Sequence, residues 1–298
     1  MPRGSFRFCF CACLFALVAL IGVACVPAET DVQDATRYKR DTTMGKIQER
    51  GVLTIAVPGD LPPFSSADEG RQPDGFVTEL AGEIAEALRV EIDYVVASGE
   101  KALDLVKAEE ADLAFPMIGI TERLARQNNF SGPFWIGHTR LLVPGDSSIM
   151  SVDDLSGEMV CQYNEERTPV DIAALDASIE IMDAAESDDC VTELREGRSV
   201  AAVAPDVQLM ALATELDGFE IRGDDLSTIG YGVAAPVEAS DMTVFVNRVL
   251  TDSKSEGRWI EYYEEWLAPV ANLEGANAPD LTLEEVATLW PRDLEPEL

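Results

Sequence analysis

The sequence predicts an α/β fold of two lobes, each a mainly parallel sheet flanked by helices, with two extended crossings between them. Three observations favour this class. Short runs rich in β-branched residues alternate with amphipathic helical segments, a pattern typical of parallel sheets covered by helices on both faces. This alternation occurs twice along the chain. Extended stretches near residues 137–143 and 227–235 join the two series, and two such crossings form a hinge.

The first lobe is expected to begin near residue 44. A buried strand is predicted over 52–57, because this run is rich in β-branched residues and is closed by Pro58 and Gly59. A helix is predicted over 76–89, where apolar side chains recur at every fourth position. The other elements expected in this lobe are a strand over 92–96, a helix over 102–111 and a strand over 113–117.

The second lobe repeats this order of elements. The predictions are strands over 159–162, 180–182 and 200–204, and a helix over 188–196. After the second crossing, amphipathic helices are predicted over 242–250 and 259–267. The acidic tail over 268–298 contains a capping box, Thr282 with Glu285, before a short helix over 283–289. The sequence leaves open whether this tail docks on the body.

The N-terminus is expected to be an export signal. Two arginines precede an uncharged apolar run over 8–24, and polar, acidic sequence follows. Such a run is short for a membrane span and is typical of a secretory signal. Cys25 and the small residue before it resemble the end of a bacterial lipobox, which predicts lipidation of Cys25; cleavage after Ala28 is the alternative. The globular part is therefore expected outside the cytoplasm, in the periplasm or at the cell surface.

The charge balance excludes nucleic acid as a partner. The chain of 298 residues carries 55 acidic and 22 basic side chains, a formal net charge of −33, and a field of that sign repels phosphate. We interpret the acidity as a source of solubility, with adaptation to high salt as the alternative. His138 is the only histidine, and no glycine-rich phosphate loop occurs. No metal or cofactor is therefore expected.

The cysteines divide into two groups. Four of the six lie in or beside the signal, at positions 9, 11, 13 and 25. The other two, Cys161 and Cys190, are an even pair in a chain expected to be exported, which predicts a disulfide. Two buried free thiols are the alternative.

Short motifs spread along the chain carry a family resemblance. They are residues 51–57, Pro62-Pro63-Phe64, Gly75-Phe76, Ala111-Asp112-Leu113, Ile120-Thr121-Glu122-Arg123, Phe130-Ser131-Gly132-Pro133-Phe134, residues 153–157, Gly230-Tyr231-Gly232-Val233 and Gly257-Arg258-Trp259. In this order and spacing they resemble the family 3 extracellular solute-binding proteins, the polar amino-acid binders of bacterial ABC importers. The resemblance covers about residues 46–267.

The resemblance implies a type II periplasmic-binding-protein fold that holds its ligand between the lobes. In this family an Arg holds the carboxylate of an α-amino acid, an Asp holds its ammonium group, and aromatic rings cover its side chain. Arg123 would be the carboxylate fork, because a guanidinium offers paired donors to two oxygens. Asp206 would take the ammonium, at a predicted strand end where ligands bind in open α/β sheets. The candidate ligand-binding residues are Phe64, Gly119, Thr121, Arg123, Tyr163, Arg167 and Asp206.

The binding motifs depart from the family at several positions. One residue separates Thr121 from Arg123, where the family has two, and Gly119 stands where a Thr helps to bind the carboxylate. Leu61 replaces an aromatic residue, and residues 164–168 replace a Gly-Ser-Thr loop. A free amino acid is therefore one candidate solute among several.

Taken together, these features predict the solute-binding component of an ABC importer, a monomer and not an enzyme, that delivers a small polar solute to a membrane permease. An alternative is a cyclohexadienyl-dehydratase-like enzyme with Glu165 or Glu166 as acid or base. A third hypothesis is a sensor or scaffold that has lost transport. The expected organisation is a signal peptide (1–24), a tether (25–43), a first lobe (44–137 and 233–267), hinge strands with a second lobe (138–232), and an acidic tail (268–298).

Overall fold

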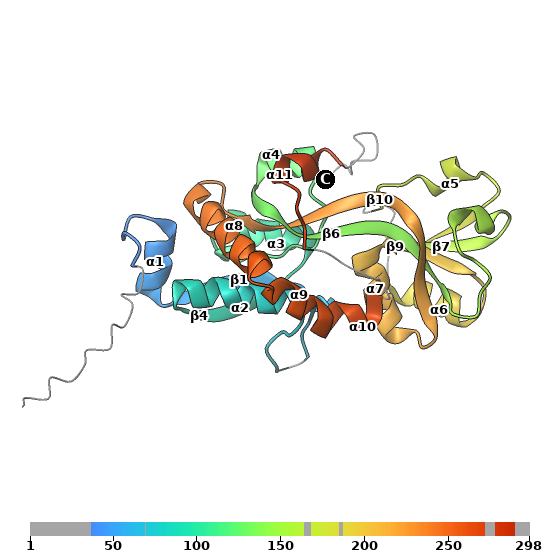
Figure 1. Cartoon of the computed structure of the whole chain (residues 1–298), viewed down its shortest axis with the longest axis horizontal. Helices are drawn as coiled ribbons and strands as arrows, with labels where there is room; N and C mark the ends of the chain where they lie inside the picture. Colours follow the sequence, from blue (N-terminus) through green and yellow to red (C-terminus); the bar gives the residue numbers. More distant parts are fainter. Residues whose placement is uncertain (1–36, 69, 164–167, 185–186, 272–277, 290–298) are drawn as a thin grey trace, which may run out of the picture. The chain divides into compact units, whose positions relative to one another are not determined.

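An eight-stranded sheet runs through the protein in the order β4-β1-β5-β10-β6-β9-β7-β8. The computed structural model describes residues 37–68, 70–163, 168–184, 187–271 and 278–289 (Figure 1). The strands of the sheet are β1 (Val52–Val57), β4 (Glu91–Val96), β5 (Leu113–Ala114), β6 (Asn129–Pro144), β7 (Met159–Tyr163), β8 (Glu180–Ala184), β9 (Ala201–Pro205) and β10 (Phe219–Ala235). A separate ribbon pairs β2 (Asp60–Leu61) with β3 (Ser65–Ser66).

The two halves of the sheet are parallel, and the strands between them are antiparallel. β1 pairs in parallel with β4 and β5, and β7 pairs in parallel with β8 and β9. The long strands β6 and β10 pair antiparallel from one half into the other. Their register shifts between Arg222 and Ser227, and twice more between Tyr231 and Ala234. These shifts lie near the crossings expected from the sequence. The predicted fold class, two α/β lobes joined by two hinge crossings, is confirmed.

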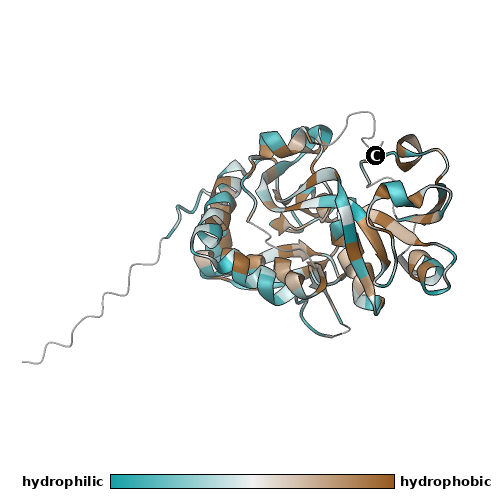
Figure 2. Ribbon diagram, turned by 45° about the vertical axis from the view of Figure 1, so that its right-hand side comes forward, coloured by the Kyte–Doolittle hydropathy of each residue, from teal (hydrophilic) through white to brown (hydrophobic). Residues whose placement is uncertain are grey.

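Helices cover both faces of the sheet (Figure 1). They are α1 (Thr43–Arg50), α2 (Phe76–Leu88), α3 (Gly99–Lys107), α4 (Glu122–Gln127), α5 (Ile172–Leu175), α6 (Ser187–Arg195), α7 (Asp206–Glu215), α8 (Ser240–Ser255), α9 (Arg258–Tyr262), α10 (Ala268–Ala271) and α11 (Leu283–Ala287). A 3₁₀ turn spans Val152–Leu155, and a π-helical turn over Tyr263–Leu267 joins α9 to α10. The helices and strands carry both hydrophobic and hydrophilic residues (Figure 2), as expected for elements with one buried face.

The sequence did not predict α1, α4, α5, α7 and α10, and two of these helices, α4 and α7, carry candidate site residues. The first turn of α7 is buried on several sides. Three consecutive residues, Val207, Gln208 and Leu209, are all below 6% exposed. A helix enclosed on several sides shows no apolar stripe, which is the signal that sequence patterns detect. α4 is a six-residue helix, too short to show a periodic pattern. The structure therefore adds helices at the ends of β5 and β9, where the candidate site was expected.

A disulfide joins Cys161 in β7 to Cys190 in α6, with 5.7 Å between their Cα atoms. Both cysteines are fully buried. The structure thus contains the disulfide that the cysteine pattern predicted, and it excludes the alternative of two free thiols for this pair. The bond fixes α6 against the second half of the sheet.

The C-terminal segments dock on the body. α10 contacts α7, while α11 contacts α4, β6 and β10. The Lys254 ammonium, on α8, donates hydrogen bonds to the backbone carbonyls of Pro133 and Pro279, at 2.9 and 3.0 Å. Residues 278–289 therefore dock on the body of the protein, which the sequence alone left open. The predicted capping box is present, because Thr282 Oγ1 accepts from the Glu285 N–H and the Glu285 carboxylate accepts from the Thr282 N–H.

Candidate functional site

Asp206 places a fully buried carboxylate at the hinge. It is the first residue of α7, follows β9 directly and is 0% exposed. Its Oδ2 accepts a hydrogen bond of 3.0 Å from the backbone N–H of His138 in β6. Its Oδ1 has no well-aligned hydrogen-bond partner in the described part of the chain. A buried oxygen in this state gains free energy when a ligand brings a donor to it.

Burial raises the pKa of Asp206 to about 7, because desolvation disfavours the charged carboxylate. The His138 backbone N–H, the Trp135 indole and the Arg140 guanidinium oppose this rise by stabilising the ionised form. Asp206 therefore changes its charge near neutral pH. A cationic group bound beside it would shift this balance towards the carboxylate.

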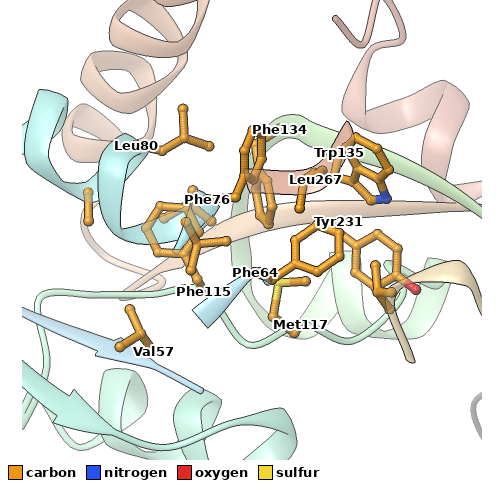
Figure 3. Close-up of a cluster of buried hydrophobic side chains, with 14 of the residues drawn as sticks. Val57, Phe64, Phe76, Leu80, Phe115, Met117, Phe134, Trp135, Tyr231 and Leu267 are labelled. Atoms are coloured by element: carbon orange, nitrogen blue, oxygen red, sulfur yellow. The ribbon is translucent and has the colours of Figure 1, made fainter. Parts of the chain in front are cut away.

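Aromatic side chains lie beside Asp206, and Phe64, Trp135 and Tyr231 among them belong to the buried cluster drawn in Figure 3. Trp135 stacks on Trp259 with ring centroids 6.0 Å apart, and on Tyr263 at 6.1 Å. Phe64 packs its ring edge-on to Trp135 at 5.5 Å. Burial and the charge of Asp206 together raise the pKa of Tyr263. This stack fixes the orientation of the Trp135 indole beside the carboxylate.

Gly137 leaves the space that the Asp206 carboxylate occupies. A Cβ atom at position 137 would lie 2.4 Å from Asp206 Oδ1 and 3.1 Å from Trp135 Nε1. The same strand contains Gly132, where a Cβ would approach only Asn247 Oδ1, at 3.6 Å. A glycine inside a strand often marks such a close approach.

Replacing Gly137 by Ala is expected to lower the free energy of unfolding by about 1–3 kcal/mol, because the added methyl group displaces the Asp206 carboxylate or the Trp135 ring. Gly132→Ala is the matched control in β6, where the methyl group fits. Urea denaturation of both variants at pH 7 measures the difference. Equal stabilities would contradict this packing of Asp206 against Gly137.

The segment before α4 is fixed to the hinge. Gly119 is buried, and the Ile120 N–H donates to the Gly230 carbonyl in β10 at 2.9 Å. Thr121, 1% exposed, caps α4: its Oγ1 accepts from the Leu124 N–H at 3.1 Å. Three candidate residues, Gly119, Thr121 and Arg123, are thus held in one short stretch at the end of the lobe.

Arg123 is the second residue of α4 and is half-buried. The family spacing, with two residues after Thr121, falls on Leu124 instead. Leu124 is 4% exposed and packs in an apolar cluster with Phe130 and Val286. At the family spacing from Thr121, this chain therefore has the buried aliphatic Leu124 in place of an Arg. Arg123 lies one position before it in α4.

The remaining candidates lie in three different places. Phe64 is 0% exposed and packs between Phe76 and Trp135, so its ring belongs to the core beside Asp206. Tyr163 is half-buried at the end of β7, and its carbonyl accepts from Thr168 Oγ1 at 3.4 Å. Outside the described residues lie Arg167, Glu165, Glu166, Cys25 and the signal segment.

Sequence reasoning missed three of the residues around Asp206. Trp135 and Gly137 belong to the long strand β6, which begins at Asn129 and not near residue 137 as expected. Alternation along a strand starting at residue 129 would have placed positions 135 and 137 on one face. Arg140 carried no signal of its own, because its effect on Asp206 depends on the pairing of β6 with β9.

His138 links the two hinge strands. Its Nδ1 lies 3.1 Å from the Ser227 carbonyl in β10. Arg140, two residues along β6, forms an ion pair of 2.5 Å with Asp225, also in β10. Among the residues that the structure describes, no group of His, Cys, Asp and Glu is arranged to hold a metal ion. Within the same residues, no helix has the length and apolar character needed to span a membrane.

Residues 53–269 match the family model described as bacterial extracellular solute-binding proteins, family 3. The chain belongs to this family. Among curated members, it is 24% identical over 259 residues to the L-cystine-binding protein TcyJ of Escherichia coli K12, covering 83% of this chain and 94% of that protein. It is 26% identical over 251 residues to an L-glutamate/L-aspartate-binding protein of Pseudomonas aeruginosa, covering 79% and 83% of the two chains.

A solved structure of the family has the same fold. The arginine-bound form of truncated ArgBP from T. maritima superposes with a TM-score of 0.57 at 27% identity, and the match covers 70% of this chain and 99% of that one. The family match ends at residue 269. α11 therefore lies beyond the part of the chain that the family model describes.

Proposed function

We propose that this protein is the solute-binding component of an ABC importer and holds an amino acid, or a related solute with an ammonium group, between its two lobes. The observation that carries the proposal is the Asp206 carboxylate. It is 0% exposed, begins α7 at the end of β9, and has one oxygen without a well-aligned partner in the described part of the chain. A bound ammonium would supply both the missing donor and the opposite charge.

The solutes named for the relatives narrow the class of ligand. L-cystine, L-glutamate or L-aspartate, and arginine differ in the charge and size of their side chains. They share an α-ammonium and an α-carboxylate group. We propose that Asp206 binds the shared ammonium and that Arg123, with Gly119 and Thr121 beside it, receives the carboxylate. Tyr163, Arg167 and Phe64 are proposed to contact or support the rest of the solute.

The proposed role is binding and delivery to a membrane permease, by a monomer and without catalysis. We also propose that the exported chain is anchored by a lipid on Cys25. Intact-mass measurement of the exported protein tests this anchor, because a diacylated Cys25 and an unmodified chain starting at Glu29 differ in mass and in their first residue. Detection of the unmodified chain alone would contradict the anchor without affecting the binding proposal.

Thermal unfolding of residues 38–298 tests the binding proposal, with amino acids, polyamines, organic acids and compatible solutes as the candidate ligands. A ligand at about 100 times its dissociation constant stabilises the folded state by about 2.7 kcal/mol, a shift of several degrees. We expect a shift with an amino acid or a related amine, and its loss in Asp206→Asn. Asp217→Asn is the control, because Asp217 is exposed after α7.

The pH dependence of binding gives a second readout. Because the pKa of Asp206 is about 7 in the unliganded protein, affinity for an ammonium-bearing solute should rise from pH 5.5 to pH 8 as the carboxylate ionises. Shifts with organic acids alone would contradict the role of Asp206. No shift with any of these solutes would contradict the transport proposal and favour the sensor or scaffold hypothesis.

A further inference from the structure

The helix α11 is buried at the hinge although it lies outside the family match. Val286 is 0% exposed and Ala287 is 7% exposed. They pack in an apolar cluster that includes Ile120, Leu124 and Phe130, with Ile136 at its edge. Figure 1 shows α11 beside α4 and over β6, in agreement with its contacts to α4, β6 and β10. The chain thus adds a short helix with one buried apolar face, Val286 and Ala287, beside the crossing strands.

Val286 fills a space that only a glycine leaves open. A Cβ atom on Gly230 would lie 1.8 Å from Val286 Cγ1. Gly230 lies in β10 between the first register shift, at Arg222/Ser227, and the second, at Tyr231/Gly232. The Val286 side chain therefore contacts the backbone of β10 at the point where the strand crosses from one lobe to the other.

Two further contacts hold this segment in place. The Lys254 ammonium bridges the Pro133 carbonyl at the start of β6 and the Pro279 carbonyl before α11. Lys254 is half-buried, and this burial lowers its pKa. The capping box of Thr282 and Glu285 fixes the first turn of α11.

The same C-terminal region also reaches the other side of the hinge. α10 contacts α7, and Leu267 and Ala271 are fully buried in the cluster that contains Tyr231. Tyr231 and Gly230 are neighbours in β10, and neighbouring residues of a strand face opposite sides. Leu267 and Ala271 thus share a cluster with Tyr231, and α11 contacts β10 on the Gly230 side.

We propose that residues 278–289 form a strap that favours the closed arrangement of the lobes. In the structure α7 of the second lobe contacts β2 of the first and Asp206 is fully enclosed, which we interpret as the closed arrangement. Opening requires backbone rotation in β6 and β10 near the crossings. Val286 fits against β10 in the present pairing of β10 with β6, so its contact stabilises the closed state more than an open one. A contact that is stronger in one state shifts the population towards that state.

The strap acts on solute affinity through the same equilibrium. A solute held between the lobes binds the closed state, so release of the strap lowers the fraction of molecules that are competent to bind. This consequence rests on the proposed function. The effect of the strap on the distance between the lobes is independent of the proposed function.

The test compares Val286→Asp with the matched change Leu289→Asp in the full exported chain. Val286 is buried and Leu289 is 37% exposed, so only the first change removes α11 from its contact with β10. Fluorescent non-canonical amino acids at the exposed positions Ala87 in α2 and Thr192 in α6 report the distance between the lobes and leave the disulfide intact. Gly230→Ala is a second variant that displaces Val286 from the opposite side of the contact.

We expect Val286→Asp and Gly230→Ala to lengthen the distance in the unliganded protein and to weaken solute binding about fivefold or more, while Leu289→Asp matches the wild type. Unchanged distances in both variants would overturn the strap, whatever the affinities. Changed distances in a protein that binds no tested solute would overturn the proposed function and leave the strap supported.

Discussion

Asp206→Asn is expected to stabilise the unliganded protein by about 4 kcal/mol at pH 8 and to leave its stability unchanged at pH 4. The pKa of Asp206 is about 7 when folded and about 4 in an unfolded chain. Below pH 4 the carboxyl group is neutral in both states. As the pH rises from 4 to 7, the unfolded state releases its proton first, so the free energy of unfolding falls by about 1.36 kcal/mol per pH unit. An amide does not titrate and avoids this loss.

Urea denaturation of wild type and variant between pH 4 and pH 8 measures the effect as a difference that grows with pH. Asp217→Asn, at an exposed position, should follow the wild type throughout. A constant difference across this range would show that Asp206 does not carry a raised pKa. A variant that is less stable than the wild type at pH 8 would indicate that the carboxylate is already satisfied by its neighbours.

The same substitution is expected to abolish solute binding, so stability and function change in opposite directions. A carboxylate buried with one unsatisfied oxygen lowers the stability of the empty protein. In the proposed function, the Asp206 carboxylate is needed because it binds the ammonium group of the solute. This relation between stability and activity is common at binding sites.

Replacing Cys161 and Cys190 together by Ala is expected to lower the free energy of unfolding by about 3 kcal/mol. The disulfide links residues 29 positions apart, and opening a loop of this length increases the entropy of the unfolded chain. Both side chains are fully buried between β7 and α6, so the loss also includes some packing. Thermal unfolding with and without a thiol reductant separates the two contributions.

Reductant should destabilise the wild type and leave the double variant unchanged. The shift of the wild type measures the cross-link alone, because its side chains keep their volume. The further difference between the reduced wild type and the variant measures the packing of the two sulfur atoms. Equal shifts in both proteins would contradict a stabilising disulfide in the exported chain.

Local sequence patterns predicted most of the sheet, because its strands are short and rich in β-branched residues. The strand over 52–57 was predicted with the bounds that the structure has. The long strands were predicted too short: β6 begins at Asn129 and β10 at Phe219, in stretches whose glycines and charged residues weaken the strand pattern. Their pairing with each other is what stabilises these stretches.

The candidate site was predicted only in part, because its environment depends on contacts between distant segments. Asp206 was predicted from the family resemblance and its place after a strand, but its burial comes from β6, from α10 and from the aromatic stack. The sequence showed that Arg123 lies one residue closer to Thr121 than the family spacing. The structure shows that Leu124, at the family spacing, is buried in an apolar cluster. No periodic pattern predicts which of two neighbouring helix residues faces a cleft.

The pairing of β6 with β10 also bears on how the chain folds. These strands lie side by side in the middle of the sheet, yet Asn129 pairs with Ala235 and Pro144 with Phe219. Until residues 219–235 emerge, β5 lacks one neighbour and β6 presents an open edge, a state prone to intermolecular pairing. Neither lobe can complete its sheet alone, so the late arrival of one strand near the C-terminus completes both lobes. Such long-range contacts make folding slow.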